Sequence, residues 1–227
     1  MTNQQTDLTW RTTTAGVVPI ATQFDDPYYS LDNGLAETHH VFIAGNSLPT
    51  RFGQDIQIAE LGFGTGLNFL ALVQAYDAAG RTGQIHFTSF EAYPLSRAQA
   101  AEALGAFPDL DAAALLAIWD DVMQGPTAYA ERITLEVITG DARTELPAWQ
   151  GRADAWFLDG FSPAKNPEMW EADLMHAVAE HTLPGGTLAT FTAAGHVRRA
   201  LSDAGFTITR VPGFGRKRHM TTGTLAP

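Results

Sequence analysis

The sequence predicts an α/β fold: a mostly parallel, doubly wound sheet with helices on both faces and an antiparallel strand at its end. Two observations predict it. From Ile56 onward, short runs rich in β-branched and aromatic residues alternate with segments whose apolar residues recur at helical spacing. A glycine-rich turn, Gly62-Phe-Gly64-Thr-Gly66, separates the first run from the first helical segment. The 227 residues suffice for one domain of this kind and are too few for a second catalytic domain.

Each element is expected from its local pattern. Runs of β-forming residues predict parallel strands at 56–59, 85–90, 133–138, 155–158 and 187–192. Apolar residues at helical period predict helices at 67–79, 96–104, 112–123, 168–181 and 197–204. Gly80, Gly105 and Gly205 stand where three of these helices should end. Residues 206–211 and 220–225 are expected to form a terminal antiparallel pair, joined by a glycine-rich basic connection.

Composition limits the class of protein. The chain has no cysteine, which excludes disulfides, thiolate metal sites and a cysteine nucleophile. No run approaches the roughly 18 apolar residues that span a bilayer, and the polar start at Met1 is not a signal peptide, so a soluble, cytoplasmic protein is expected. The net charge of −11 disfavours nucleic-acid binding unless the cations gather on one face. No metal is expected, because metal-ligand spacing is missing around His39, His40, His176 and His181.

The glycine-rich turn predicts a cofactor site. Without Cβ atoms, Gly62, Gly64 and Gly66 let the backbone turn sharply and bring its N–H groups close to a ligand at the start of the next helix. A dinucleotide fingerprint would put its third glycine where Leu67 stands, so the spacing favours S-adenosylmethionine. Glu91 closes the next run, roughly 25 residues after the last glycine, and is expected to accept hydrogen bonds from the ribose hydroxyls.

Further cofactor contacts are expected around the same edge of the sheet. Asp141 and Ala142 follow the third run, where a carboxylate can accept a hydrogen bond from the adenine amine. Glu60, in front of the glycine-rich turn, and Asn68, just after it, are assigned to the same cofactor site.

The segment after the fourth run carries the candidate catalytic residues. Asp159 is expected to face both the cofactor and a methyl acceptor, where a carboxylate holds an amine in line and takes its surplus proton. Phe161 would place a ring beside the developing cation. An acid, a small residue and an aromatic here partly match the motif of amino-group methyltransferases. The alternatives are that Asp159 caps a helix or turn and that Phe161 is a core residue.

Two sets of cations are candidate substrate contacts. Lys165, in the loop after Asp159, is expected to meet a phosphate or the cofactor carboxylate, with a solvated loop lysine as the alternative. Arg216, Lys217 and Arg218 form the densest basic cluster and are expected to receive an RNA backbone at the pocket rim. A chance surface cluster is the alternative there.

Residues 1–50 precede the first predicted parallel strand. They are expected to form an N-terminal extension that covers the cofactor pocket, and residues 51–227 the main domain. Because Asp32-Asn-Gly34 is a strong turn signal, the extension is expected to contain a small hairpin.

Several segments together resemble one family, and their order along the chain is the same as in that family. These segments are Asp32-Asn-Gly-Leu, Ala59-Glu-Leu-Gly-Phe-Gly-Thr-Gly-Leu-Asn-Phe, Leu158-Asp-Gly-Phe-Ser-Pro-Ala-Lys-Asn-Pro-Glu-Met-Trp, Pro184-Gly-Gly-Thr-Leu-Ala-Thr-Phe-Thr and Gly213-Phe-Gly-Arg-Lys-Arg. Over about residues 24–223 the chain resembles the methyltransferase domain of the bifunctional tRNA 5-methylaminomethyl-2-thiouridine biosynthesis proteins, the MnmC family.

The resemblance implies a Rossmann-like class I methyltransferase that uses S-adenosylmethionine. Its substrate would be 5-aminomethyl-2-thiouridine at the wobble position of tRNA, which it would N-methylate to 5-methylaminomethyl-2-thiouridine. The resemblance implies that Asp159 and Phe161 meet the aminomethyl group and that Tyr28 and Asn33 are lid contacts. By the same likeness the residues that surround the cofactor are Gly62, Gly64, Gly66, Glu91, Asp141 and Asp159.

The chain departs from the bifunctional members in one respect. Those members carry a flavin-dependent oxidase half that first removes a carboxymethyl group, whereas this chain ends at Pro227, so no FAD is expected. The tRNA would then arrive in its aminomethyl form, either from upstream modification enzymes that use ammonium or from a separate oxidase. Two other functions stay open: a methyltransferase acting on a small-molecule amine, and a non-catalytic S-adenosylmethionine-binding partner of a tRNA-modifying enzyme.

Overall fold

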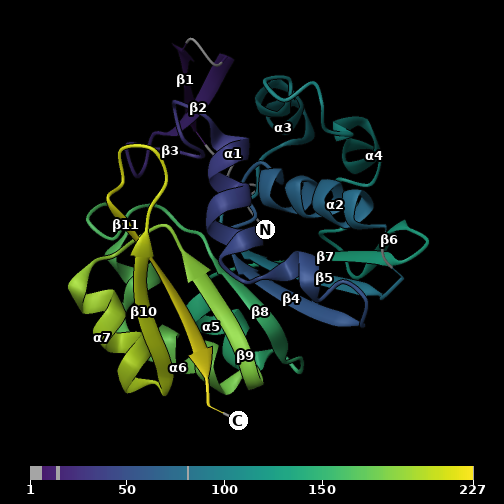
Figure 1. Ribbon diagram of the computed structural model, residues 1–227. Helices are drawn as coiled ribbons and strands as arrows, with labels where there is room; N and C mark the ends of the chain where they lie inside the picture. The colour runs from purple at the N-terminus through teal and green to yellow at the C-terminus, as the bar shows by residue number, and fades with distance from the viewer. Residues whose placement is uncertain (1–6, 14–15, 81, 227) are drawn as a thin grey trace.

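A twisted, mostly parallel sheet forms the centre of the molecule (Figure 1). The computed structural model describes residues 7–13, 16–80 and 82–226, and within them this sheet has eight strands, in the order β10-β11-β9-β8-β4-β5-β7-β6. Its five middle strands run parallel to one another and confirm the predicted α/β class. They are β4 (Ile56–Leu61), β5 (Ile85–Glu91), β7 (Ile133–Thr139), β8 (Ala153–Leu158) and β9 (Thr182–Thr190).

Antiparallel strands close both edges of the sheet. β11 (His219–Leu225) inserts between β9 and β10 (Phe206–Pro212), which confirms the predicted terminal antiparallel pair. At the other edge β6 (Thr127–Ala130) pairs antiparallel with β7. The sequence pattern did not predict β6, because four residues are too few to establish a period.

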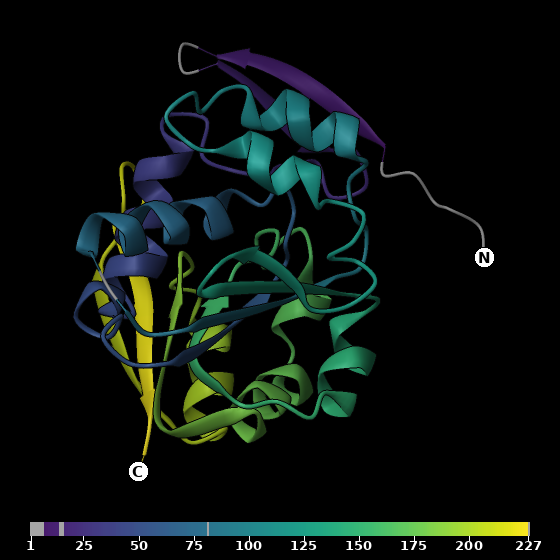
Figure 2. The same cartoon turned by 90° about the vertical axis from the view of Figure 1, so that its right-hand side faces the viewer.

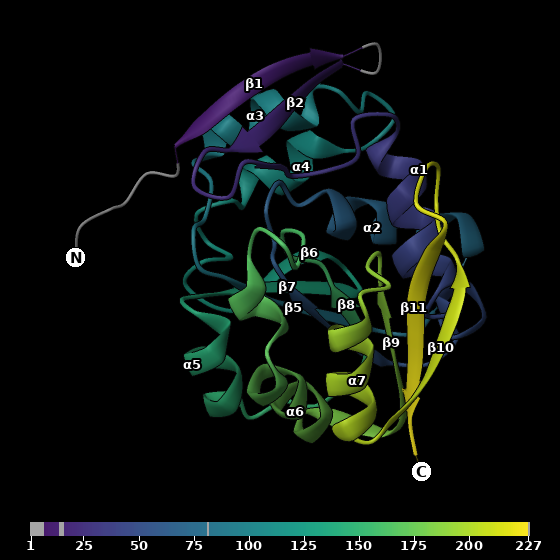
Figure 3. The same cartoon turned by 90° about the vertical axis from the view of Figure 1, so that its left-hand side faces the viewer.

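Helices cover both faces of the sheet (Figures 2 and 3). On one face lie α2 (Leu67–Ala79), α1 (Gly34–Thr38) and the π-helical segment η1 (His39–Ala44), and on the other lie α5 (Ala142–Ala148), α6 (Ala172–Glu180) and α7 (Gly195–Asp203). Because successive strand residues point to opposite faces, Phe157 packs in the core on the α2 side, whereas Trp156 and Leu158 pack in the core on the α6 side.

Two helical predictions are corrected, and one helix was not predicted. The predicted 112–123 helix ends early as α4 (Ala112–Ala117), and the chain then turns so that the buried Trp119 indole donates to the carbonyl of Leu95. The predicted 168–181 helix is split into a 3-10 turn, η3 (Pro167–Trp170), and α6, because Glu171 between them is extended. Helix α5 was not predicted, since Pro147 near its end disguises the helical pattern. Helix α3 (Arg97–Leu104) begins at the predicted place, with Ser96 as its N-cap.

The N-terminal region forms its own small antiparallel sheet, β1-β2-β3. Strands β1 (Leu8–Thr13) and β2 (Gly16–Ala21) make a hairpin, with β3 (Asp26–Pro27) beside β2. Residues 1–6, including the polar start, and 14–15 lie outside the described residues. The Asp32-Asn-Gly34 turn is not a hairpin turn: the Asn33 side chain accepts from the N–H of Ala36 and caps α1.

The strand order places a topological switch point at β4. From β4 the chain adds β5 and then β7 on one side, and it later adds β8 and β9 on the other. In open α/β sheets ligands bind in the crevice outside the carboxyl ends of the strands at such a point. Within residues 7–13, 16–80 and 82–226, none of the helices combines the length and apolar character that crossing a bilayer requires.

Candidate active site

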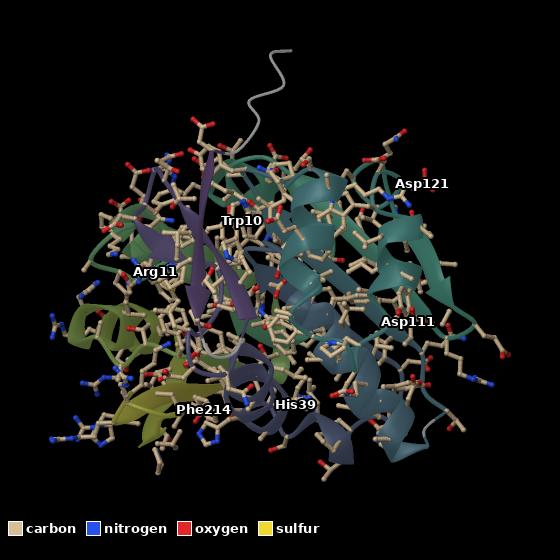
Figure 4. All side chains as sticks on the ribbon, turned by 90° about the horizontal axis from the view of Figure 1, so that it is seen from above. Trp10, Arg11, His39, Asp111, Asp121 and Phe214 are labelled. Carbon is tan, nitrogen blue, oxygen red and sulfur yellow. The ribbon has the colours of Figure 1, made fainter. Side chains whose placement is uncertain are left out.

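A cavity of about 650 Å³ opens at the carboxyl ends of β4, β5 and β8. Its walls come from the turn after β4, the end of β5, the start of α5, the loop after β8, the N-terminal region and the β10–β11 loop. Figure 4 shows Phe214 of that last loop on the same side of the molecule as His39 of η1. The His40 ring ties the two segments together, since its Nε2 lies 3.0 Å from the carbonyl oxygen of Pro212.

The glycine-rich turn forms the floor of this cavity. Gly62, Gly64 and Gly66 all have positive φ angles, of 92°, 54° and 79°, which L residues with side chains rarely adopt. A Cβ at Gly62 would overlap the carbonyl oxygen of Asp159, and one at Gly64 would lie 3.0 Å from the Tyr28 ring. At these glycines no side chain covers the backbone, so a nucleoside cofactor can lie close against the turn. Gly62 and Gly64 line the cavity, whereas Gly66 starts α2 behind it.

Glu91 lies at the end of β5, where the sequence placed a ribose-binding acid. Its Oε2 accepts from the N–H of Gly64 and its Oε1 from the N–H of Tyr93, both at 2.8 Å. Burial raises the pKa of the Glu91 carboxyl, and these backbone hydrogen bonds oppose the increase. The carboxylate is thus fixed against the glycine-rich turn and lines the cavity.

Asp159 stands at the base of the cavity beside the turn. Its Oδ2 accepts from the side-chain amide of Asn68 at 2.6 Å. Desolvation, and then the charge of Glu37, raise the pKa of Asp159 to about 7, while the hydrogen bond from Asn68 and the charge of Lys217 oppose the increase. A carboxyl with such a pKa is a stronger base than an ordinary aspartate and still ionises near neutral pH.

Glu60 does not reach the cavity. Its side chain is fully buried behind the turn and accepts hydrogen bonds from Asn68 at 2.8 Å and from Ser89 at 2.7 Å. Burial raises the pKa of Glu60 to about 8. Glu60 is therefore not among the lining residues, whereas Asn68, which donates to it, does line the cavity.

Asp141 and Ala142 line the cavity at the start of α5, and Asp141 is the N-cap of that helix. Both carboxylate oxygens of Asp141 accept from the Arg143 Nε at 3.0 Å, and Arg143 also pairs with Glu168 at 2.8 Å. The hydrogen bond from Arg143 is the main cause that lowers the pKa of Asp141. Sequence reasoning missed Arg143, whose partner Glu168 comes from the 3-10 turn η3.

An aromatic group surrounds Phe161. Its ring stacks on Phe24 with centroids 4.6 Å apart and meets Tyr28 edge-on at 5.2 Å. All three rings line the cavity, so the structure brings the predicted Phe161 and Tyr28 together and adds Phe24. Asn33, the other predicted lid residue, is not among the lining residues, because its side chain caps α1.

The predicted cationic contacts are already paired with acids. Lys165 contacts the backbone carbonyl of Asp25 and lies 3.3 Å from its carboxylate and 3.5 Å from that of Asp26. Lys217 pairs with Glu37 at 2.8 Å, and its Nζ sits 4.3 Å from the centroid of the Phe191 ring. Both lysines line the cavity, and the ion pairs of each one link two segments of the cavity wall.

The two arginines of the basic cluster project outward. Arg216 lines the cavity mouth and reaches Asp32 at 3.5 Å with a side chain that is 90% exposed, so this pair is weak. Arg218 is exposed and lies outside the cavity lining. Among the residues that the structure describes, no group of three or more His, Cys, Asp or Glu side chains could hold a metal ion.

Comparison with known proteins settles the family. A family model described as S-adenosyl-L-methionine-dependent methyltransferase matches residues 112–226, half of the chain. The chain belongs to this methyltransferase family. The residues that line the cavity fit S-adenosylmethionine. They include the glycines of the turn after β4, the hydrogen-bonded carboxylate of Glu91 at the end of β5, and Asp141 at the start of α5.

Relatives of this methyltransferase agree on the fold. The chain is 45% identical over 97% of its length to the tRNA 5-methylaminomethyl-2-thiouridine biosynthesis bifunctional protein MnmC of Chromohalobacter salexigens, and it spans about a third (33%) of that protein. Of solved structures, MnmC2 from Aquifex aeolicus matches with a TM-score of 0.78 and 25% identity, over 99% of this chain and 72% of that one. Spermidine synthase from Thermotoga maritima shares the fold, with a TM-score of 0.59, 10% identity and coverage of 98% and 69%.

Proposed function

We propose that this methyltransferase N-methylates 5-aminomethyl-2-thiouridine at the wobble position of tRNA and so produces 5-methylaminomethyl-2-thiouridine. The observation that carries the proposal is the position of Asp159, which lines the cavity: its backbone carbonyl lies beside Gly62 of the glycine-rich turn, Asn68 holds its carboxyl, and its raised pKa makes it a stronger base than an ordinary aspartate. The 45% identity to an MnmC protein supports this substrate.

The residues that line the cavity have different roles in the proposed reaction. S-adenosylmethionine, when bound, supplies an activated methyl group. In our proposal Gly62, Gly64 and Glu91 hold the nucleoside part of the cofactor, with Asp141 and Ala142 at the adenine. Asp159 accepts a hydrogen bond from the acceptor amine, aligns its lone pair and takes the proton that the methylated nitrogen releases. Phe161, held by Phe24 and Tyr28, places its ring beside the positive charge on that nitrogen.

A basic face beside the cavity supports tRNA as the substrate. From residue 191 onward the chain carries six lysines and arginines and one acid, Asp203, whereas the preceding residues hold 8 of the 14 cations and 24 of the 25 acids. The pKa of His219 is lowered, first by desolvation and then by the charges of Arg210, Arg218 and Arg198, so cations of β10, α7 and the loop converge there. Such a local cluster can bind phosphates although the whole protein is acidic.

We also propose that residues 1–50 act as an extension of the main domain, 51–227, that covers the cofactor pocket. Phe24, Asp26 and Tyr28 of this region line the cavity, and Asp26 accepts from the N–H of Ser162 in the loop after β8 at 2.8 Å. The proposed substrate must already carry an aminomethyl group. A separate oxidase or an ammonium-using modification enzyme would therefore act before this one, in the cytoplasm with the tRNA.

The test is methyl transfer from labelled S-adenosylmethionine to tRNA that carries 5-aminomethyl-2-thiouridine, followed by digestion and separation of the nucleosides. We expect the label in 5-methylaminomethyl-2-thiouridine, and none in tRNA whose wobble position is already methylated. Cofactor binding without labelled tRNA would contradict the proposal. Transfer to small amines in that case would identify a small-molecule methyltransferase, and no transfer at all a non-catalytic partner.

A further inference from the structure

The side-chain amide of Asn68 joins three other elements beneath the cavity. Its Nδ2 donates to Glu60 Oε1 of β4 at 2.8 Å and to Asp159 Oδ2 after β8 at 2.6 Å. Its Oδ1 accepts from the Thr38 hydroxyl at the end of α1, also at 2.8 Å. On the far side, the Ser89 hydroxyl donates to Glu60 Oε2 at 2.7 Å. The result is a continuous chain of hydrogen bonds from α1 to β5, from which Asn68 makes one further bond to the candidate base, Asp159.

The pattern of donors and acceptors allows one orientation of the amide. An asparagine offers two N–H donors and one carbonyl acceptor, and here both donors face carboxyl groups while the acceptor faces a hydroxyl. A flipped amide would set its oxygen against Asp159 and Glu60 and leave two poorly solvated carboxyls without their donor, which is costly in such surroundings. The two carboxyl groups therefore set the orientation of the amide, and the Thr38 hydroxyl, which donates to the amide oxygen, anchors the group that holds Asp159.

All three partners are buried, and Thr38 and Asn68 line the cavity whereas Glu60 does not. Glu60 is 0% exposed, Thr38 4% and Asn68 7%. Glu60 does not line the cavity, so its carboxyl cannot touch a ligand there. Burying an ionisable side chain costs free energy unless the side chain is hydrogen-bonded. The hydrogen bond from Asn68 connects Glu60 to a residue that lines the cavity.

We infer that Asn68 is a positioning residue for methyl transfer, and that Thr38 and Glu60 act through it to hold the Asp159 carboxylate toward the acceptor amine. The inference rests on the proposed function, because it takes Asp159 as the group that meets the amine. It gives Asn68 and Glu60 a role in aligning the base in place of a contact with the cofactor.

A substitution at Thr38 tests how the Asn68 amide is held without changing the charges around Asp159. The charged and titratable groups that face Asp159 are Glu37 of α1, Lys217 of the β10–β11 loop and, through Asn68, Glu60 of β4. Thr38→Val changes none of them, since it replaces a hydroxyl by a methyl group of similar size. Thr38→Ser keeps the hydroxyl and is the matched control.

The experiment measures kcat, KM and their pH dependence for both variants with S-adenosylmethionine and tRNA. We expect Thr38→Val to lower kcat about tenfold, the effect of one displaced hydrogen bond. We also expect it to move the acidic limb of the kcat profile upward by about one pH unit, and to leave the calorimetric Kd for S-adenosylmethionine unchanged. Thr38→Ser should keep kcat, the acidic limb and the Kd close to their wild-type values. Equal kcat values for the two variants, or a weaker Kd at unchanged kcat, would overturn the inference.

A second readout does not depend on activity. The ¹³C carboxyl shift of Asp159, followed against pH, should titrate about one unit higher in Thr38→Val than in the wild-type protein, because its donor is no longer fixed. If Thr38→Val does not fold, Asn68→Leu provides the test, since it removes both donors, keeps a similar size and adds no charge. A wild-type protein that methylates no tRNA would defeat the proposed function alone, whereas an unchanged titration midpoint would defeat this inference.

Discussion

At the scale of single residues, Asp159 decides the chemistry. Because the pKa of Asp159 is raised to about 7, the carboxyl is protonated below neutral pH and kcat should fall as pH falls through that value. Asp159→Asn keeps the shape but cannot take a proton, so we expect kcat to drop by about 10²–10⁴-fold and the acidic limb to disappear. Stopped assays with labelled cofactor between pH 5.5 and 9 measure both. A folded variant that transfers methyl groups normally would remove Asp159 from the mechanism.

Glu91 should act on cofactor affinity and not on turnover. Glu91→Ala removes an acceptor that the protein has fixed with the N–H groups of Gly64 and Tyr93, so we expect the binding of S-adenosylmethionine to weaken by roughly 1.5–3 kcal/mol, the range for hydrogen bonds to a charged group. Isothermal titration calorimetry measures this, with the exposed Glu131→Ala as control. Equal affinities for the two variants would show that Glu91 does not hold the ribose.

The sequence predicted the residues of the site that depend on local pattern, and it missed what depends on distant partners. Glu91 and Asp159 line the predicted cavity because the ends of parallel strands meet at one edge of a sheet. The burial of Glu60 could not be read from its neighbours in the chain. Nor could the pairing of Lys217 with Glu37, which brings together segments 180 residues apart.

At the scale of elements, the strand carrying Glu60 makes stability depend on pH. Burial raises the pKa of Glu60 from 4.5 to about 8, so between these values the folded state keeps a proton that the unfolded state has lost. This contribution to stability is complete below pH 4.5 and is lost as pH rises through about 8. Glu60→Gln keeps both hydrogen-bonding positions without a titrating group. We expect its free energy of unfolding in urea to fall less between pH 5.5 and 8.5 than that of the wild-type protein.

The control for this prediction is Glu131→Gln, whose side chain is exposed. It should show the same pH dependence as the wild-type protein. The residual slope in Glu60→Gln should include contributions from Asp159 and Glu91, whose pKa values are also raised. A Glu60→Gln protein that loses stability with pH as steeply as the wild-type protein would show that Glu60 is ionised in the folded state.

The elements themselves were predictable in proportion to their length and regularity. Helix α2 has its predicted bounds, since thirteen residues with a glycine at each end give a clear period. The predicted ranges for α4 and α6 were too long, because the helical spacing of apolar residues includes Trp119 after α4 and Trp170 before α6. Both tryptophans are instead buried in turns. Such buried positions are defined by their tertiary partners and not by their spacing.

At the scale of the whole molecule, charge is unevenly distributed along the chain. The net charge of −11 argues against nucleic-acid binding, yet the last part of the chain is basic, and the fold brings Arg198 of α7, Arg210 of β10 and Arg218 of the loop together around His219. The sequence showed the cluster at 216–218 but not this convergence, which depends on how α7 packs beside the antiparallel pair. In our proposal these cations, which lie near Arg216 and Lys217 of the cavity lining in the chain, would attract the phosphates of an approaching tRNA.

The basic face gives the last prediction. Arg216 and Arg218 are exposed, and Arg216 is held by no more than a weak pair with Asp32, so both are available to phosphates. Replacing both by Ser should raise the KM for tRNA, leave the Kd for S-adenosylmethionine unchanged and reduce the slope of log affinity against log salt by about 1.4, or 0.7 per single-strand phosphate contact. The matched control is Arg152→Ser, an exposed arginine at the opposite end of β8 from the cavity. Filter binding from 50 to 300 mM salt measures the slope, and equal slopes for the double variant and the control would place the tRNA on another face.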